Sequence, residues 1–249
     1  MIALFDSGST HLHFGLWDNG RLIRIDHLPY PPGPASLEAV ITVLVDDFVL
    51  SGAAACSVSN TWREALFRVV EGIVPGKLRV ARTAADIGVA LPYTASETYG
   101  VDRALAVRAA HRRFEASCVV ADAGTALTVD AVNDDGSVAG GFIIPGFHLQ
   151  ASALRTSTDL PTVTPDGDDA ELGRSTEDSI RLGISYGFHA AAKDLIKRAA
   201  IAVQAGDRII LTGGDADEIA SLFPEPIVVT PGLVLEGLGL VMENLPCFA

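Results

Sequence analysis

The feature that most constrains this chain is a strand–corner–strand pattern that occurs twice. In the middle of the chain, an apolar run from Cys118 stops at Asp122, and Gly124 and Thr125 follow as a tight corner. Apolar and polar residues then alternate until the Asn-Asp-Asp-Gly segment at 133–136. Period-two alternation that ends in an Asp-Gly turn is the sequence form of a β-hairpin.

The same pattern stands near the N-terminus, 116 residues earlier, where Asp6 takes the place of Asp122. The shift also brings Gly124 onto Gly8 and the glycine of the later turn onto Gly20. Asp and Gly are ordinary turn residues, so one such corner alone would carry little information. The shared spacing across corner, strand and turn is a weak internal repeat and favours two related halves.

Each corner places an acidic side chain beside backbone that glycine leaves uncovered. Such backbone can approach a phosphate closely, and its N–H groups and a Thr hydroxyl can donate to the phosphate oxygens. The chain has no Gly-x-x-x-x-Gly-Lys-Ser/Thr segment, so a P-loop is excluded. Two corners of this kind, one from each half, predict a pair of phosphate clamps. Phosphoryl transfer suits them, because its catalysis consists mainly of positioning and charge neutralisation.

Elsewhere, strand-like and helix-like segments alternate, which predicts sheets with crossover helices rather than a sandwich. We expect three strands within 2–27 and a Thr61–Glu64 capping box at the second helix. Ser36 is the expected cap of the first helix, and Asp215 of a later one. Further strands are predicted at 53–59, 78–81 and 208–211. Helices are predicted over 36–48 and 147–157, three more are expected to begin at about 61, 99 and 176, and two more to end at 222 and 241.

Asp102 and Arg103 fall in the first turn of the helix predicted from about Tyr99. An acid is favoured at a helix N-terminus, so Asp102 alone has a structural explanation. A cation there opposes the helix dipole, and Arg103 makes sense if its guanidinium fork faces an anionic ligand such as a carboxylate. A Gly-x-Ser-x-Gly match at 183–187 resembles a hydrolase elbow, but it lies inside a predicted helix and is rejected.

His11 and His13 share one face of a predicted strand, where they could bind metal. No third ligand is indicated, so exposed structural positions are the preferred interpretation. The three cysteines are far apart, and Cys56 and Cys118 lie in apolar runs, which predicts buried thiols rather than disulfides.

Length and charge set the remaining limits. At 249 residues we expect two domains, 1–115 and 116–249. A net charge of −13 disfavours nucleic acid and anionic membranes as partners, although ATP accompanied by a divalent cation is not excluded. The sequence shows no signal peptide and no membrane span, which predicts a cytoplasmic protein.

Taken together, the motifs resemble those of the type III pantothenate kinases, in the superfamily of acetate and sugar kinases, heat-shock chaperones and actin. The family's two phosphate motifs match 6–10, with Gly15, and 122–128. Its Gly-Gly-x-Ile-x-Pro-Gly segment is similar to 140–146, its Gly-x-Asp-Arg signature to 100–103, and its adenosine-type Thr-Gly-Gly to 212–214. These matches follow the family order along nearly the whole chain.

The resemblance implies duplicated actin-like (ribonuclease H-like) α/β domains with a ligand cleft between them, and phosphorylation of pantothenate as the first step of coenzyme A biosynthesis. It implies ATP, Mg²⁺ and a monovalent cation (K⁺ or NH₄⁺), and a homodimer. Asp102 would be the catalytic base, Asp6 would hold Mg²⁺ through water, and Asp122 would bind the monovalent cation. The implied ATP-binding residues are Asp6, Ser7, Gly8, Ser9, Thr10, His11, Leu12, His13, Thr125, Gly213 and Gly214. The implied substrate-binding residues are Tyr93, Gly100, Val101, Asp102, Arg103 and Thr176.

One position departs from the family pattern, because Ser9 stands where the family has Asn. Serine keeps a hydroxyl donor but is shorter and lacks the amide, which predicts a weaker grip on ATP. Three alternatives stay open: a kinase for another small hydroxylated substrate, a nucleotide-binding regulator on the same fold, and an unrelated hydrolase. A different substrate is disfavoured by the set Tyr93, Asp102, Arg103 and Thr176. Ser9 favours the regulator. The hydrolase is disfavoured because the chain offers no plausible Ser-His-Asp context.

Overall fold

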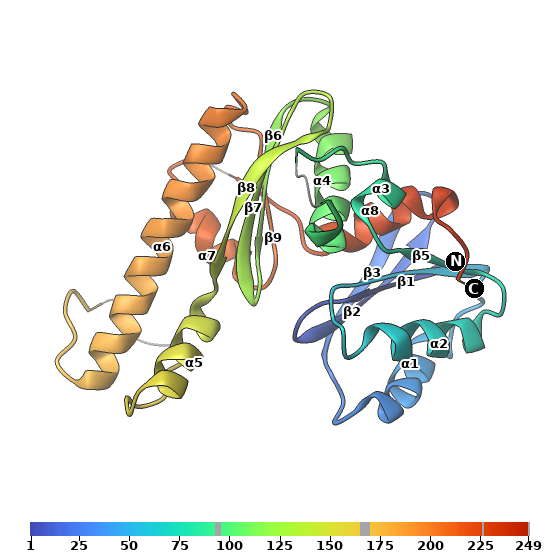
Figure 1. The fold of residues 1–249 in the computed structure, drawn as a ribbon, viewed down its shortest axis with the longest axis horizontal. Helices are drawn as coiled ribbons and strands as arrows, with labels where there is room; N and C mark the ends of the chain where they lie inside the picture. The colour runs from blue at the N-terminus through green and yellow to red at the C-terminus, as the bar shows by residue number, and fades with distance from the viewer. Residues whose placement is uncertain (93–95, 165–169, 226, 249) are drawn as a thin grey trace. The chain divides into compact units, whose positions relative to one another are not determined.

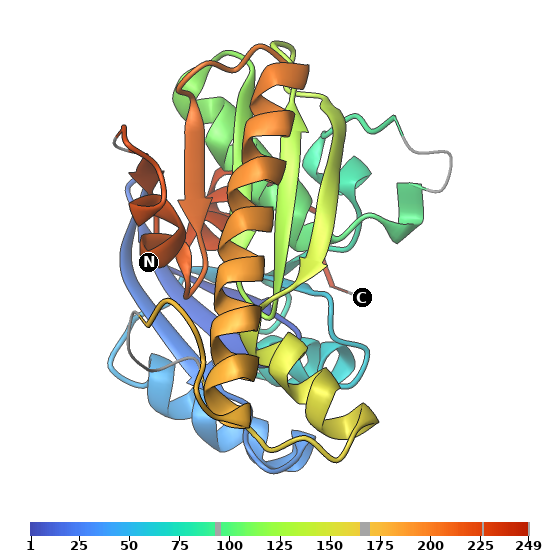
Figure 2. The ribbon, with the colours of Figure 1, turned by 90° about the vertical axis from the view of Figure 1, so that its left-hand side faces the viewer.

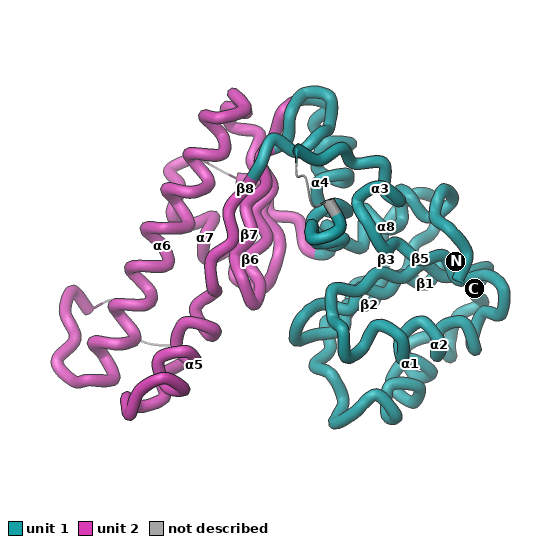
Figure 3. The backbone as a smooth tube through the Cα atoms, viewed as in Figure 1, with its two compact units in different colours: residues 1–116, 132–140, 232–249 teal, residues 117–131, 141–231 magenta. Residues whose placement is uncertain are grey.

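The computed structural model describes residues 1–92, 96–164, 170–225 and 227–248. They form two compact units: unit 1 comprises 1–116, 132–140 and 232–249, and unit 2 comprises 117–131 and 141–231 (Figure 3). The chain leaves unit 1 next to the predicted boundary at 115/116 and returns to it at the C-terminus. The division into duplicated domains at that boundary stays a prediction.

Unit 1 is built on a five-stranded sheet in the order β3-β2-β1-β4-β5. Strands β1, β2 and β3 are an antiparallel meander, as predicted, and β4 and β5 run parallel to β1. The bounds are β1 Ile2–Ser7, β2 His11–Asp18, β3 Arg21–Pro29, β4 Gly52–Ser57 and β5 Leu78–Ala81.

Helices cover both faces of this sheet (Figure 1). One face packs on α1 (Leu37–Val45) and α2 (Arg63–Ile73) through a core that contains Phe5, Phe14 and Phe67. The other face packs on α4 (Val101–Phe114) and α8 (Leu233–Val241). Short elements complete the unit: η1 Pro34–Ser36, α3 Ala84–Ile87, η2 Ser96–Thr98 and η3 Met242–Asn244.

Neither helix cap predicted in unit 1 makes a side-chain capping bond, although Ser36 holds the N-cap position of α1. Ser36 precedes α1 but makes no side-chain cap bond, because it already has helical backbone angles as the last residue of η1. The capping box predicted at Thr61 does not form either, since α2 begins two residues later, after Trp62. A capping box forms instead at α3, where the Thr83 hydroxyl accepts from the Asp86 amide.

Unit 2 has a second five-stranded sheet in the order β10-β9-β6-β7-β8. The predicted central hairpin is confirmed, and the tip that joins β7 to β8 (132–140) belongs to unit 1. The bounds are β6 Cys118–Ala123, β7 Ala126–Val132, β8 Val138–Pro145, β9 Ile209–Thr212 and β10 Val228–Val229. Its helices are α5 Phe147–Ser157, α6 Thr176–Ala202 and α7 Ala216–Ser221.

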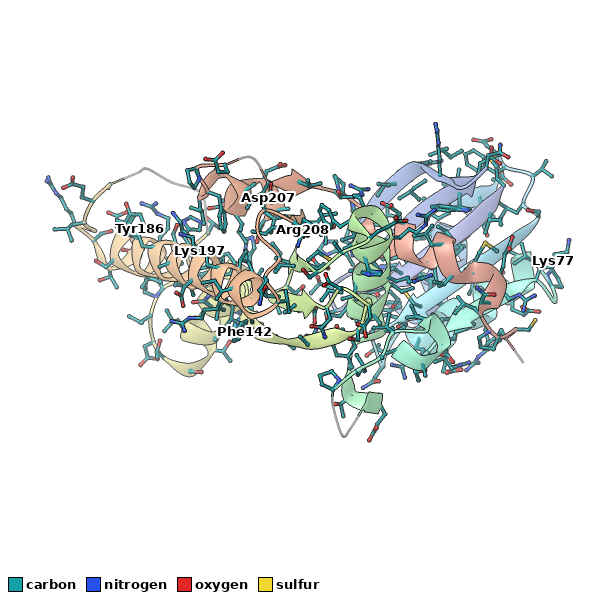
Figure 4. The ribbon with its side chains drawn as sticks, turned by 90° about the horizontal axis from the view of Figure 1, so that it is seen from above. Lys77, Phe142, Tyr186, Lys197, Asp207 and Arg208 are labelled. Atoms are coloured by element: carbon teal, nitrogen blue, oxygen red, sulfur yellow. The ribbon has the colours of Figure 1, made fainter. Side chains whose placement is uncertain are left out.

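The long helix α6 lies along the sheet of unit 2 (Figure 2), and Ala192 and Ile196 on it enter a core shared with β6 and β9. Tyr186 and Lys197 mark its outer side (Figure 4). The hydrolase-like segment at 183–187 lies inside α6, which confirms its rejection. Within the described part of the chain, none of the helices combines the length and apolarity that crossing a bilayer requires.

Candidate functional site: two Asp-Gly corners and an acidic cluster

The first corner joins β1 to β2 and carries Asp6 almost completely buried, with 5% of its surface exposed. The parallel pairing of β1 with β4 places Asp6 directly opposite Cys56. The Cys56 thiol is fully buried and donates to Oδ1 of Asp6 over 3.3 Å. A buried carboxylate therefore has a neutral donor from the neighbouring strand.

Asp102 belongs to the same cluster. It lies in the first turn of α4, as predicted, and its Oδ1 accepts from the Arg103 amide at 2.7 Å. The pKa of the Cys56 thiol is raised well above its usual range, first by burial, then by the Asp6 carboxylate and also by the charge of Asp102. The charges of Asp6 and Asp102 thus both act on the same thiol, which contacts Asp6 directly. We call Asp6, Cys56 and Asp102 the acidic cluster.

The residues next to Asp102 shape its surroundings. A Cβ atom on Gly100 would collide with Oδ1 of Asp102, so the glycine leaves room for the carboxylate. The Arg103 guanidinium lies 4.3 Å from the centre of the Tyr99 ring, a cation–π contact that fixes its direction. Val101 is buried, so only its backbone can reach a ligand.

Tyr30 braces the first corner and was missed by the sequence analysis. Its hydroxyl donates to the Gly8 carbonyl at 2.9 Å and lies 2.6 Å from Oγ of Ser7. Its ring stacks on Trp62 with the centroids 4.3 Å apart. Burial, chiefly, raises the pKa of Tyr30 to about 12, so the hydroxyl stays protonated. Tyr30 begins the proline-rich segment 30–34, and no local pattern marks such a brace.

Two histidines beside this corner, His13 and His27, lie in direct contact. The Nδ1 atoms of His13 and His27 are 2.6 Å apart, so the two rings share one proton. Burial, followed by the charges of His27 and His11, lowers the pKa of His13 to about 4. Over the described residues, no group of three or more His, Cys, Asp or Glu side chains could hold a metal ion. The Leu12 side chain is buried, so it can offer a ligand only backbone.

The second corner joins β6 to β7 and lies entirely in unit 2. The parallel pairing of β6 with β9 places Asp122 opposite Thr212, which is followed by Gly213 and Gly214. Gly213 has a φ of +91°, and a Cβ on it would lie 2.6 Å from Oδ1 of Asp122 and collide with the Ala123 carbonyl. Only glycine therefore lets the ends of β6 and β9 approach this closely.

A third loop closes on the second corner. The Gly146 amide donates to the Thr125 carbonyl at 3.0 Å, and a Cβ on Gly146 would lie 2.6 Å from the Gly124 carbonyl. Gly146 is the N-cap of α5 and makes no side-chain cap bond. First-turn amides that no side chain caps can donate to an anion. The corner thus presents an exposed Thr125 among three glycine-bearing loops, an arrangement that can accommodate phosphate groups and a nucleoside.

Of the predicted substrate residues, Thr176 lies in unit 2, at the start of α6. Thr176 is the exposed first residue of α6, and the capping hydroxyl belongs to Ser175, whose Oγ accepts from the Asp178 amide at 3.0 Å. The Thr176 hydroxyl is therefore not needed for the cap. Tyr93 and the acidic segment 165–169 lie outside the described residues.

Comparison with known proteins agrees with this geometry. Residues 2–198 match the family model for type III pantothenate kinase. A type III pantothenate kinase from Alkalilimnicola ehrlichii is 37% identical over 240 residues, which are 94% of this chain and 95% of the relative.

Two solved structures share the fold at low identity. One is a conserved Campylobacter jejuni protein assigned to the Baf family of transcriptional activators (TM-score 0.62, 19% identity, 97% and 98% of the two chains covered). The other is component A of (R)-2-hydroxyglutaryl-CoA dehydratase from Acidaminococcus fermentans (TM-score 0.56, 12% identity, 98% of each chain covered). The predicted fold class, duplicated actin-like α/β domains, is confirmed. The chain belongs to the type III pantothenate kinase family, and it is a kinase that transfers a phosphoryl group to pantothenate for coenzyme A biosynthesis.

Proposed function

We propose that Asp102 is the general base of this reaction and accepts the proton from the primary hydroxyl of pantothenate as the γ-phosphoryl group of ATP is transferred. The observation that carries the proposal is the acidic cluster, in which Asp102 and Asp6 both act on the Cys56 thiol. A base must lie near the group that positions the transferred phosphate. The electrostatic link of Asp6 and Asp102 through Cys56 supports this arrangement.

Asp6 suits a magnesium ion that is held mainly by phosphates. Mg²⁺ takes oxygen ligands and usually keeps several waters, with one or two protein carboxylates and the substrate phosphates. Asp6 is one buried carboxylate, and the described residues contain no group of three possible metal ligands. This fits a magnesium ion that is held mainly by water and substrate phosphates. Asp6 would hold the ion through water, and the ion would neutralise charge on the transferred phosphate. Gly8, Ser9 and Thr10 would donate to the same phosphate.

The second corner suits the rest of the nucleotide. Thr125 would bind the phosphates, and Gly213 and Gly214 leave the space that a base or ribose needs. Asp122 would bind a monovalent cation, K⁺ or NH₄⁺, beside the phosphates. His11 and His13 would border the phosphates next to the first corner, and His13, whose pKa is lowered to about 4, would add no charge there.

Pantothenate would bind at the N-terminus of α4. Arg103, aligned by the Tyr99 ring, would grip its carboxylate, and Gly100 would let the substrate approach Asp102. Thr176 has a hydroxyl that the helix cap does not use, which supports its predicted contact with pantothenate. Tyr93 is proposed from the family motif alone. The working form would be a cytoplasmic homodimer with substrate contacts completed by the partner subunit.

The competing proposal is a nucleotide-binding regulator, which Ser9 favours. The intact acidic cluster favours the enzyme, because a regulator does not need a base beside the phosphate site. A coupled assay with pantothenate, ATP and Mg²⁺, with and without K⁺, separates the two. We expect phosphorylation that K⁺ stimulates, whereas ATP binding without turnover would support the regulator. Replacing Ser9 with Asn should lower the Michaelis constant for ATP, and an unchanged value would remove Ser9 from ATP binding.

A further inference from the structure

A small cavity in unit 1 is lined by two arginines and belongs to none of the sites described above. Its lining residues are Ser57, Arg63, Phe67, Ala81 and Arg82, and we call it the arginine cavity. Its volume is about 80 Å³. A water molecule needs roughly 10–15 Å³ of such space, so the cavity has room for several waters or for one tetrahedral oxyanion.

The arginine cavity lies on the opposite face of the sheet from the acidic cluster. Cys56 and Ser57 are successive residues of β4, so their side chains point to opposite faces. Cys56 faces Asp6, whereas Ser57 lies in the cavity with Phe67 of α2. The cavity is at the carboxyl ends of the parallel strands β4 and β5, the edge where open α/β sheets bind ligands.

Both arginines are held in place by contacts that leave their charges unpaired. The Arg82 guanidinium lies 5.2 Å from the ring centre of Phe67 and 6.0 Å from that of Phe248. The Arg63 guanidinium donates to the Ser57 carbonyl at 3.3 Å. Within the described ranges, neither arginine pairs with a carboxylate.

The acids near the cavity do not cancel this charge. The Asp86 carboxylate accepts from the backbone amides of Arg82 and Thr83, at 2.9 and 3.0 Å, and does not line the cavity. The N-terminus of α2 begins at Arg63 and has no side-chain cap from its N-cap residue, which adds positive potential. In a chain of net charge −13, two adjacent unpaired guanidinium groups are a local site for an anion.

We propose that the arginine cavity binds a phosphate dianion, either inorganic phosphate or the phosphate group of a small phosphomonoester. Two guanidinium groups match two negative charges, and each presents donors in a planar fork that fits phosphate oxygens. A carboxylate carries one charge and needs only one guanidinium. In the proposed pantothenate site, Arg103 supplies that single guanidinium. The cavity uses no residue of the proposed reaction, so the proposal goes beyond the kinase activity.

The test is isothermal titration calorimetry on the full chain at constant ionic strength. The chain is first saturated with Mg²⁺ and a non-hydrolysable ATP analogue, so that the nucleotide phosphate site is filled. Inorganic phosphate, methyl phosphate and acetate are then titrated separately. We expect saturable binding of inorganic phosphate and little heat from acetate. If methyl phosphate binds as tightly as inorganic phosphate, the ligand is the phosphate group of a phosphomonoester. If methyl phosphate does not bind, the ligand is free inorganic phosphate.

Arg63→Gln and Arg82→Gln should each weaken phosphate binding about tenfold or more, because each removes a charge-assisted hydrogen-bond donor. Arg68→Gln, an exposed charge on the same helix, is the matched control and should change affinity by less than about twofold. Arg82 is exposed, so its variant gives an answer even if Arg63→Gln misfolds. Absence of saturable phosphate binding, equal binding of acetate, or full affinity in the Arg82 variant would overturn the proposal. Kinase activity has no part in this readout, so failure here leaves the proposed reaction untouched.

Discussion

The two Asp-Gly corners have the same local sequence pattern, yet their surroundings differ. In unit 1 the neighbouring parallel strand places Cys56 opposite Asp6, and the aspartate is buried against a thiol. In unit 2 the neighbouring parallel strand places Thr212 opposite Asp122 and continues into two glycines, which leave Asp122 half-buried beside open backbone. The comparison shows that the neighbouring strand, and not the corner motif itself, sets the surroundings of each aspartate. On the proposed function, this difference assigns the first corner to chemistry and the second to binding.

The largest effect should come from the base of unit 1. Asp102→Asn keeps the shape of the side chain but removes its ability to accept a proton. We expect kcat to fall about a thousandfold, the range of a lost general base. ATP affinity, measured by equilibrium binding, should stay nearly unchanged. Turnover close to the wild-type rate would show that unit 1 does not supply the base.

The next effect should come from the binding corner of unit 2. Gly213→Ala adds a Cβ that meets the Ala123 carbonyl and Asp122, at a φ of +91° that disfavours alanine. A strained backbone of this kind costs about 2 kcal/mol, so the Michaelis constant for ATP should rise roughly thirtyfold. Gly183→Ala in α6 of the same unit is the matched control, because a Cβ there has nothing within 4 Å. Equal effects of the two substitutions would contradict the close approach of β6 and β9.

A smaller effect should separate the two buried thiols. Cys56→Ala removes the donor to Asp6, and we expect the Mg²⁺ concentration for half-maximal activity to rise about fivefold, as for one lost hydrogen bond. Cys56→Ser should restore much of the response, because serine also donates. Cys118→Ala in β6 is the control, since that buried thiol lies in the other unit. If Cys118→Ala also raised the Mg²⁺ concentration for half-maximal activity fivefold, the effect of Cys56→Ala would come from lost packing and not from the lost hydrogen bond.

The smallest effect concerns the pH dependence of unit 1. The pKa of His13 is about 4 in the folded chain, so between about pH 6.5 and 4 the unfolded chain binds the extra proton. Stability should therefore be complete above pH 6.5 and fall by about 3 kcal/mol as the pH drops to 4. His13→Gln should flatten this part of the profile in urea unfolding, and His189→Gln in unit 2 should not. An unchanged slope in the His13 variant would contradict the lowered pKa of His13.

Local patterns predicted the elements that depend on local chemistry. The hairpin after Asp122 and the helix 147–157 follow from alternation, turn residues and the Pro145-Gly146 boundary, and both are confirmed. The capping box at Thr61 failed because α2 begins at Arg63 with Trp62 at its N-cap, and the Trp62 ring stacks on Tyr30. That stacking joins residues distant in sequence, which no local pattern reveals.

The site shows the same limit. The motifs identified Asp6 and Asp102 as candidates, but not that a thiol connects them, because Cys56 reaches Asp6 only through the register of β1 with β4. The sequence predicted a buried thiol at Cys56, which is correct, without indicating its partner. The Tyr30 brace and the His13–His27 pair depend in the same way on contacts between elements.

The central claim is that equal corners have unequal roles, and the cation dependence of two variants tests it most directly. Asp6→Asn and Asp122→Asn are assayed across titrations of Mg²⁺ and, separately, of K⁺. The account predicts that Asp6→Asn raises the Mg²⁺ requirement about tenfold or more with an unchanged K⁺ response, and that Asp122→Asn shifts the K⁺ response alone. Indistinguishable titrations for the two variants would contradict it.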